Sequence, residues 1–354
     1  MYLISSLLRH LLYPSFSRSG VFRAFRNRKM KNALTVVTYH GVFPKKYKVE
    51  DRLFDGNLIR SYEFQEQLRL LKSNYNVIRP EEFNACFERD DSLPPNSILI
   101  TCDDGLLNNV TEMLPILKHE GLSCLFFITT ESAKSFLPIL WHEELYLMLK
   151  RALRDLPGAK VKNGNLPREA WWKFIKEFSR VGQGNRQEVI DRLRQELGLK
   201  KDWGTFIREN QALKERFMLL SLPDLELLRN AGMTLGSHTC THPILSLLPR
   251  NVAQYEIEAS RHNLEHELGV RVWALSYPFG DPASVTSREM SIAEHAGYRC
   301  GFINYGGLVA SAKESPFCLQ RVHVSADMTL AEFEAHVSGF HTAFRDRIIR
   351  QKTI

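Results

Sequence analysis

The sequence predicts an α/β fold built on a parallel sheet, and closure of that sheet into a (β/α) barrel is one solution. Three observations carry this prediction. Apolar, strand-like runs alternate along the chain with amphipathic, helix-like runs. Acidic and histidine clusters follow two of the strand-like runs, at the strand ends where barrel active sites lie. Between Thr130 and Ser221, about ninety residues contain no convincing strand, which predicts a helical insertion after the third strand.

The predicted strands are short apolar runs rich in β-branched and aromatic residues, a composition typical of buried strands. They cover Leu34–Tyr39, Ser97–Cys102, Ser123–Thr129, Thr234–Ser237, Val272–Tyr277, Arg299–Ile303 and Leu319–Val324. Because helix-like runs separate them, successive strands are expected to be parallel.

The helices between these strands have recognisable starts and ends. Ser61 can cap one helix, and Asn108 or Asn109 can cap the next. Ser221 begins a third with a capping-box-like pattern and a proline in the first turn. Three glycines follow the last periodic position of a helix and predict its end: Gly121, Gly232 and Gly269.

Two clusters far apart in the sequence carry the residue types of a metal site. Asp103 and Asp104 follow one strand-like run, and His238 and His242 follow another. The two imidazoles can share one face of a helical turn or converge from a tight loop after the strand. One of the adjacent carboxylates can bind a metal while the other takes a proton from water. The pattern indicates hydrolysis by a metal-activated water.

These motifs resemble those of the polysaccharide deacetylases, which share the NodB homology domain (carbohydrate esterase family 4). Thr101–Gly105 is similar to the family's Thr-Phe-Asp-Asp-Gly, with Cys102 in place of Phe, and Ser237–His242 is similar to its Ser/Thr-His-x-x-x-His. Tyr277–Gly280 resembles a third motif that ends Pro-x-Gly. Two further stretches also agree: Thr38–Val42 and Leu319–Val322. The resemblance covers about residues 34–340 and implies a distorted (β/α) barrel, often with seven strands.

The resemblance also implies roles for individual residues. Asp104, His238 and His242 would bind a divalent metal, usually zinc in this family, and Asp103 would be the general base. The supporting or substrate-binding positions would be Tyr277, Pro278 and Arg321. The implied reaction removes N-acetyl groups from a polysaccharide or another glycan or glycoconjugate.

Two departures from the family pattern affect the groups that assist these residues. Many members carry an arginine that orients the base where this chain has Ser276, so either Arg321 takes that role or the role is absent. The late Leu-x-His, whose histidine serves as the general acid, has no clean match. We favour His40 as the acid, with His323 as the alternative and a structural histidine at a strand end as the other interpretation of His40.

The insertion is expected at about residues 131–220, with helices over Leu140–Leu153, Pro167–Phe178 and Gln187–Leu197. Four of the five tryptophans lie in it: Trp141, Trp171, Trp172 and Trp203. They either hold a small helical subdomain together or stack on sugar rings. Trp141-His142-Glu143-Glu144 lacks the spacing of a metal motif and is interpreted as a helix start.

Composition fits one large α/β domain with an insertion, since 44% hydrophobic and 25% charged residues are ordinary for a globular protein of 354 residues. The predicted divisions are a basic segment at 1–31, the deacetylase domain at 32–345 and a tail at 346–354. The six cysteines form no Cys-x-x-Cys pair, which favours buried reduced thiols in a reducing compartment.

Residues 1–31 carry all of the net charge of +7, because they contain seven basic and no acidic residues. Their apolar residues recur at helical spacing, as in segments that lie on anionic membrane surfaces. The segment is too short to span a bilayer and lacks a secretory layout. We expect a cytoplasmic protein that contacts the inner face of the membrane; a helix packed on the domain or a partly disordered arm is the alternative. No motif or basic stripe indicates nucleic-acid binding.

The sequence therefore predicts a metal-dependent hydrolase of carbon–nitrogen bonds that deacetylates a glycan. Two alternatives stay open. One is an amidohydrolase of the same fold that acts on a small or lipid-linked sugar or on a non-sugar amide. The other is a catalytically inactive glycan-binding protein, which the missing arginine and acid favour and the intact Asp103, Asp104, His238 and His242 oppose.

Overall fold

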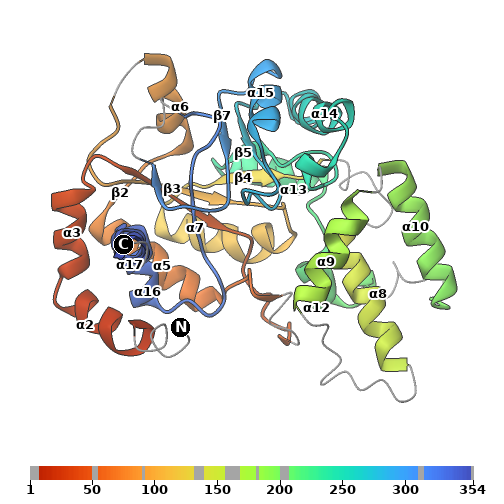
Figure 1. Cartoon of the computed structure of the whole chain (residues 1–354), viewed down its shortest axis with the longest axis horizontal. Helices are drawn as coiled ribbons and strands as arrows, with labels where there is room; N and C mark the ends of the chain where they lie inside the picture. Colours follow the sequence, from red (N-terminus) through yellow and green to blue (C-terminus); the bar gives the residue numbers. More distant parts are fainter. Residues whose placement is uncertain are drawn as a thin grey trace.

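The computed structural model describes residues 8–49, 55–89, 92–130, 139–155, 168–180, 183–199, 207–309 and 315–351. Figure 1 shows a central sheet with the helices of residues 13–29 and 330–351 toward one end of the longest axis. The helices of residues 141–196 lie toward the other end. The strands therefore separate a terminal group of helices from an inserted group.

Seven parallel strands form the body of the sheet, in the order β7-β6-β5-β4-β3-β1-β9. They are β1 (Leu34–Tyr39), β3 (Ser97–Cys102), β4 (Leu125–Ile128), β5 (Thr234–Ser237), β6 (Ala274–Ser276), β7 (Cys300–Phe302) and β9 (Val322–His323). Each lies within a run that the sequence predicts as a strand. The sequence prediction omits two strands of two residues each: β2 (Asn76–Val77), parallel to β3, and β8 (Leu308–Val309), antiparallel to β1.

The segment that leads into β9 brings the two ends of this sheet together. Leu319 forms a parallel bridge with Phe302 at the end of β7. Four residues later, His323 in β9 pairs with Thr38 in β1. The strands thus form the distorted, seven-stranded (β/α) barrel that the family resemblance implies.

Alternate side chains of the strands point to different hydrophobic clusters, as the two-residue period of a strand requires. Val36, Leu99 and Phe127 belong to one cluster. Their neighbours Val37 and Ile100 belong to a larger cluster that includes side chains of the surrounding helices. Both sets are fully buried, which explains why these strands are apolar at every position rather than alternating.

The barrel helices are α5 (Ser61–Asn74), α6 (Pro80–Arg89), α7 (Leu114–Glu120), α13 (Leu222–Asn230), α14 (Arg250–Leu268) and α15 (Ser287–His295). Ser221 caps α13 and forms the predicted capping box with Asp224. The prediction for α5 is wrong by one residue. Arg60 is the N-cap because its backbone N–H donates to the carboxylate of Glu63, at 2.9 Å.

The inserted helices are α8 (Trp141–Asp155), α9 (Arg168–Ser179), α10 (Gln183–Glu196) and α12 (Gln211–Phe217). Trp141 and Trp171 lie in a hydrophobic cluster of their own with Ile175 and Phe178. This separate core explains why the insertion interrupts the strand–helix alternation. Trp203 and residues 131–138 of the predicted insertion lie outside the described residues.

The basic N-terminal segment is part of the folded body. Its helices α2 (Tyr13–Arg18) and α3 (Val21–Lys29) meet α16 (Leu330–Val337) and α17 (Phe340–Gln351), with Phe22 fully buried between Tyr13 and Phe340. The periodic apolar residues of this segment therefore include core contacts, as the packed-helix alternative predicts. The boundary predicted at residue 345 falls inside α17, because the helix continues beyond Phe344, whose ring stacks on Phe340. Among the described helices, none combines the length and apolar character needed to cross a membrane.

Candidate metal centre and active site

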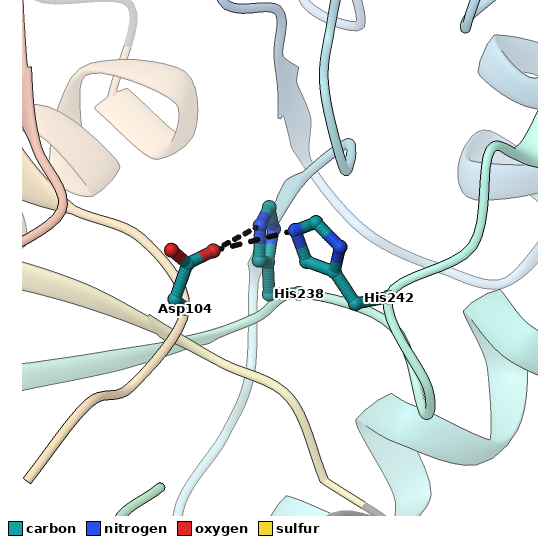
Figure 2. A group of neighbouring side chains, drawn as sticks. All are labelled: Asp104, His238 and His242. Carbon is teal, nitrogen blue, oxygen red and sulfur yellow. Dashed lines mark ion pairs between the residues drawn. The ribbon is translucent and has the colours of Figure 1, made fainter. Parts of the chain in front are cut away.

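The two clusters found in the sequence meet at the carboxyl ends of the strands. Asp103 and Asp104 follow β3, and the loop with His238 and His242 follows β5. Figure 2 shows Asp104 and the two imidazoles pointing toward one another. Oδ1 of Asp104 lies 3.4 Å from Nε2 of His238 and 3.3 Å from Nε2 of His242. The histidines converge from a tight loop, one of the two arrangements that their spacing allows.

The donor set fits a small divalent metal. The ligand atoms of Asp104, His238 and His242 all lie within 4.8 Å of one another. Ligands about 2.0–2.1 Å from a tetrahedral zinc ion are about 3.3 Å apart, close to the two distances from Asp104. Nδ1 of His238 lies 2.8 Å from the carbonyl oxygen of Ser276, which fixes the N–H on Nδ1 and leaves the Nε2 lone pair for a metal.

The electrostatics of these groups suit metal binding, which requires neutral imidazoles and an ionised carboxylate. Burial opposes ionisation of Asp104, but the imidazoles of His238 and His242 beside it hold the pKa of its carboxyl well below the usual range. Burial lowers the pKa of His242, which keeps this imidazole neutral near pH 7.

The histidine loop is held by residues that the sequence analysis missed. Glu256 of α14 accepts the backbone N–H groups of Cys240 and Thr241, each at 2.9 Å. Trp141 at the start of α8 donates its indole N–H to the carbonyl oxygen of His242 at 2.9 Å. Glu256 is fully buried on the apolar stripe of α14, and an acidic residue at such a helical position is the signal that could have revealed it.

Backbone strain is concentrated at this site. Among the described residues, five other than glycine have positive φ, and four of them lie here: Asp104 (76°), Thr239 (66°), His242 (58°) and Phe279 (61°). Left-handed conformations cost free energy for residues with a Cβ and persist only where the surroundings impose them. The loops therefore place these side chains at a cost in backbone conformational free energy.

Asp103 is held by the arginine that the sequence offers as a replacement. Arg321 donates to both carboxylate oxygens, at 2.7 Å to Oδ1 and 2.6 Å to Oδ2. Ser276 adds a hydrogen bond to Oδ2 at 3.0 Å. Burial opposes ionisation, but Arg321 overcomes it and lowers the pKa of Asp103 to about 2. Three of roughly four acceptor positions of a carboxylate are thus occupied, and one remains on Oδ1.

Both candidate acids lie at the same pocket. His40 follows β1 directly, and the N–H of Asp103 donates to the carbonyl oxygen of the preceding Tyr39, at 2.9 Å. The ring of His40 lies 5.1 Å from that of His323. Nδ1 of His40 is buried and has no hydrogen-bond partner among the described atoms. Burial lowers the pKa of His323 to about 3.

The pocket over these residues has a volume of about 310 Å³. Its lining includes the predicted Asp103, Asp104, His238, His242 and His40, together with Asn57, His142, Trp172, Phe279, Asp281, Asn304 and His323. Tyr277 and Pro278 are not among the lining residues, and Tyr277 is fully buried. The third motif thus contributes Phe279, whose ring lies 5.0 Å from that of His242.

The sequence analysis interpreted His142 and Glu143 only as part of a helix start, but both have further roles. His142 lines the pocket, with its ring 5.1 Å from that of His242. Glu143 and Asp55 pair with the fully buried Arg216, at 2.9 and 3.0 Å. These contacts join α8, α12 and the segment after β1. Since His142 belongs to the insertion, no motif of the barrel could have revealed it.

Comparison with known proteins identifies relatives of the chain. Residues 205–301 match the family model described as polysaccharide deacetylase. A curated relative from Bacillus subtilis (strain 168), named "Putative polysaccharide deacetylase YxkH", is 20% identical over 287 residues, which is 80% of this chain and 72% of that protein.

Solved structures of low sequence identity share the fold. The Streptococcus pyogenes deacetylase PplD, solved in complex with acetate, has a TM-score of 0.56 at 15% identity, and the match covers 87% of this chain and 99% of that one. IcaB from Ammonifex degensii has a TM-score of 0.54 at 18% identity, covering 87% and 97%. Together with the family model and the motif residues at one pocket, these likenesses support one assignment. Residues 205–301 match the polysaccharide deacetylase family, a family of hydrolases of carbon–nitrogen bonds other than peptide bonds, and the described fold resembles that of solved deacetylases.

Proposed function

We propose that the protein is a metal-dependent hydrolase that removes N-acetyl groups from a polysaccharide or another glycan or glycoconjugate. The observation that carries the proposal is one pocket with two separate sets of groups. Asp104, His238 and His242 offer three ligand atoms to a divalent ion, with zinc as the proposed metal. Asp103 lines the same pocket but is held apart from these ligands by Arg321.

In this proposal, each group of the chain has one task. A bound divalent ion supplies Lewis acidity, which polarises a carbonyl oxygen and makes water more acidic. Asp103 accepts the proton of the attacking water through the open acceptor position on Oδ1, while Arg321 and Ser276 fix the plane of its carboxylate. Tyr277 and Pro278 directly precede Phe279 in the chain and support the site by placing its ring at the pocket.

His40 is our proposed general acid. The main-chain hydrogen bond between Tyr39 and Asp103 places it beside the base at the strand ends. Its unpartnered Nδ1 leaves that atom able to exchange a proton with a leaving amine. His323 remains the second candidate, but its lowered pKa leaves it without a proton to donate as an imidazolium near pH 7.

Acetate release from a panel of acetylated sugars tests this function. The panel contains N-acetylated oligosaccharides, a lipid-linked acetylated sugar and a non-sugar acetamide, each assayed after thorough demetallation and after addition of zinc or another divalent ion. We expect release from a glycan only with metal. Release from the acetamide or lipid-linked sugar alone would favour the amidohydrolase alternative. Full activity without metal contradicts the mechanism, and glycan binding without release under any condition indicates the inactive glycan-binding protein.

We propose that residues 32–345 form the deacetylase domain with its insertion at about 131–220, and that the protein is cytoplasmic. No disulfide joins the six cysteines, four of which are buried, and this supports a reducing compartment. We further propose a peripheral membrane contact through the N-terminal helices. Tyr13, Phe22 and Arg26 are buried there, but Arg18, Arg23 and Arg28 are exposed and Leu11 is 60% exposed.

The membrane contact predicts a loss of vesicle binding on removal of exposed charge. Replacing Arg18, Arg23 and Arg28 together with glutamine should weaken binding to phosphatidylserine-containing vesicles about 100-fold, because each basic residue near an anionic surface contributes about 1 kcal/mol. Cosedimentation measures the binding. The matched control replaces three exposed basic residues outside these helices: Lys118, Arg250 and Arg271. Equal binding by both triple variants, or equal binding to neutral phosphatidylcholine vesicles, contradicts the proposal.

A further inference from the structure

The three described tryptophans of the insertion occupy two different environments. Trp141 and Trp171 are buried in the core of the insertion, at 7% and 3% exposure. Trp172 is 37% exposed and lines the pocket over the candidate metal centre. Its large apolar surface is therefore available to a ligand, whereas the other two side chains hold the inserted helices together.

The indole of Trp172 is held against the site by a chain of ring contacts. Its ring centroid lies 5.8 Å from that of Phe279, in an edge-to-face arrangement at 78°. Phe279 in turn lies 5.0 Å from the proposed ligand His242 and 5.7 Å from His142. Phe279 also has a strained backbone, with φ of 61°, so its ring position is imposed by the loop. The aromatic wall thus has a fixed place relative to the metal centre.

The insertion that presents Trp172 is itself anchored to the catalytic loops. Trp141 donates a hydrogen bond to the carbonyl oxygen of His242 at 2.9 Å. Glu143 pairs with Arg216, which also pairs with Asp55 in the segment after β1. These buried contacts hold α8 in place, and α9 packs on α8 through the rings of Tyr146 and Trp171, which lie 5.8 Å apart.

The size of the pocket limits what can lie inside it. Its volume of about 310 Å³ is at the small end of the range of about 300–1,000 Å³ for small-molecule pockets. A single acetylated sugar ring fits that space better than a chain does. A longer glycan must therefore extend out of the pocket, whose lining includes the partly exposed Trp172 and the polar side chains of Asn57, Asp281 and Asn304.

We propose that Trp172 is a specificity-determining residue that stacks on the sugar ring next to the acetylated one. A pyranose ring has an apolar C–H face and polar edges, which match an indole with amide and carboxylate groups around it. The inference rests on the proposed function and narrows its substrate: the enzyme acts on glycans with at least two rings, and monosaccharides lose the contact with Trp172.

Kinetics on a length series test this inference. The probe is the acetylated sugar that the wild-type enzyme deacetylates fastest, prepared as monomer, dimer and trimer. We expect Trp172→Ala to raise KM about tenfold for dimer and trimer, with KM for the monomer and kcat for all three changed less than twofold. Trp172→Phe should restore most of the affinity. Tyr62→Ala, which removes a 56% exposed aromatic ring on α5, is the matched control.

The outcomes separate the inference from the function on which it rests. No acetate release by the wild-type enzyme from any probe overturns the proposed function. Release with the same length dependence in wild type and Trp172→Ala overturns the role of Trp172 alone. A loss that is equal for monomer and trimer also overturns it, because it indicates general damage to the pocket, and thermal melting of each variant identifies any loss of folding.

Discussion

Asp103→Asn is expected to reduce acetate release by about 10²–10⁴-fold while leaving the metal content of the protein nearly unchanged. The amide is too weak a base to take the proton of water, but the ligand atoms of Asp104, His238 and His242 remain in place. His238→Ala should instead remove both activity and metal. Acetate release and metal analysis of the purified variants, run side by side, give the result.

The contrast between these two variants is the informative part of the experiment. His266→Ala, which removes an imidazole that is 86% exposed on α14, should match the wild type in activity and metal content and controls for the loss of a histidine. If Asp103→Asn lost metal as completely as His238→Ala, Asp103 would be a ligand and the division of tasks proposed for the two aspartates would be wrong.

Arg216→Met is expected to destabilise the protein by about 3–5 kcal/mol, as measured by denaturant unfolding. Arg216 is fully buried between Asp55 and Glu143, so its removal leaves two buried carboxylates without their cation. Arg69→Met is the matched control, because this arginine is 58% exposed and its partner Glu120 keeps a hydrogen bond from Gln65. That variant should unfold close to the wild-type midpoint.

A second variant tests whether uncompensated charge causes the loss of stability in Arg216→Met. Adding Glu143→Gln to Arg216→Met removes one of the two buried carboxylates that lose their cation, so the double variant should recover part of the lost stability. A double variant less stable than Arg216→Met would show that packing around Arg216, rather than charge, holds the insertion to the barrel.

The strands were the most predictable part of the fold. Runs such as Leu34–Tyr39 and Ser97–Cys102 are apolar at every position because both of their faces are buried, and the structure ends both strands at the predicted residues. Helix boundaries depend on side-chain hydrogen bonds that sequence specifies less well. Glu63 selects Arg60 rather than Ser61 as the cap of α5, and Phe340 with Phe344 continues the last helix through a predicted tail.

The residues of the candidate site also include some that the sequence predicts and some that it does not. The spacing of the metal-binding motifs predicts Asp104, His238 and His242 directly. Arg321 could be predicted because Ser276 stands where many family members carry the arginine that orients the base. His142 and Trp172 could not be predicted, because they reach the pocket from an insertion that has no pattern in common with the barrel motifs. Only the tertiary contacts of the inserted helices determine which of their residues face the site.

The contact between Asp103 and Arg321 joins residues 218 positions apart, and Arg321 lies in the segment whose pairing with β7 and β1 brings the ends of the sheet together. During synthesis, the metal-binding residues emerge well before this segment does. A chain that ends before residue 321 contains Asp104, His238 and His242 but lacks the cation that pairs with Asp103 and the segment that joins β7 to β1. The proposed base and the closure of the sheet thus both depend on the segment around residue 321, whereas the proposed metal ligands do not.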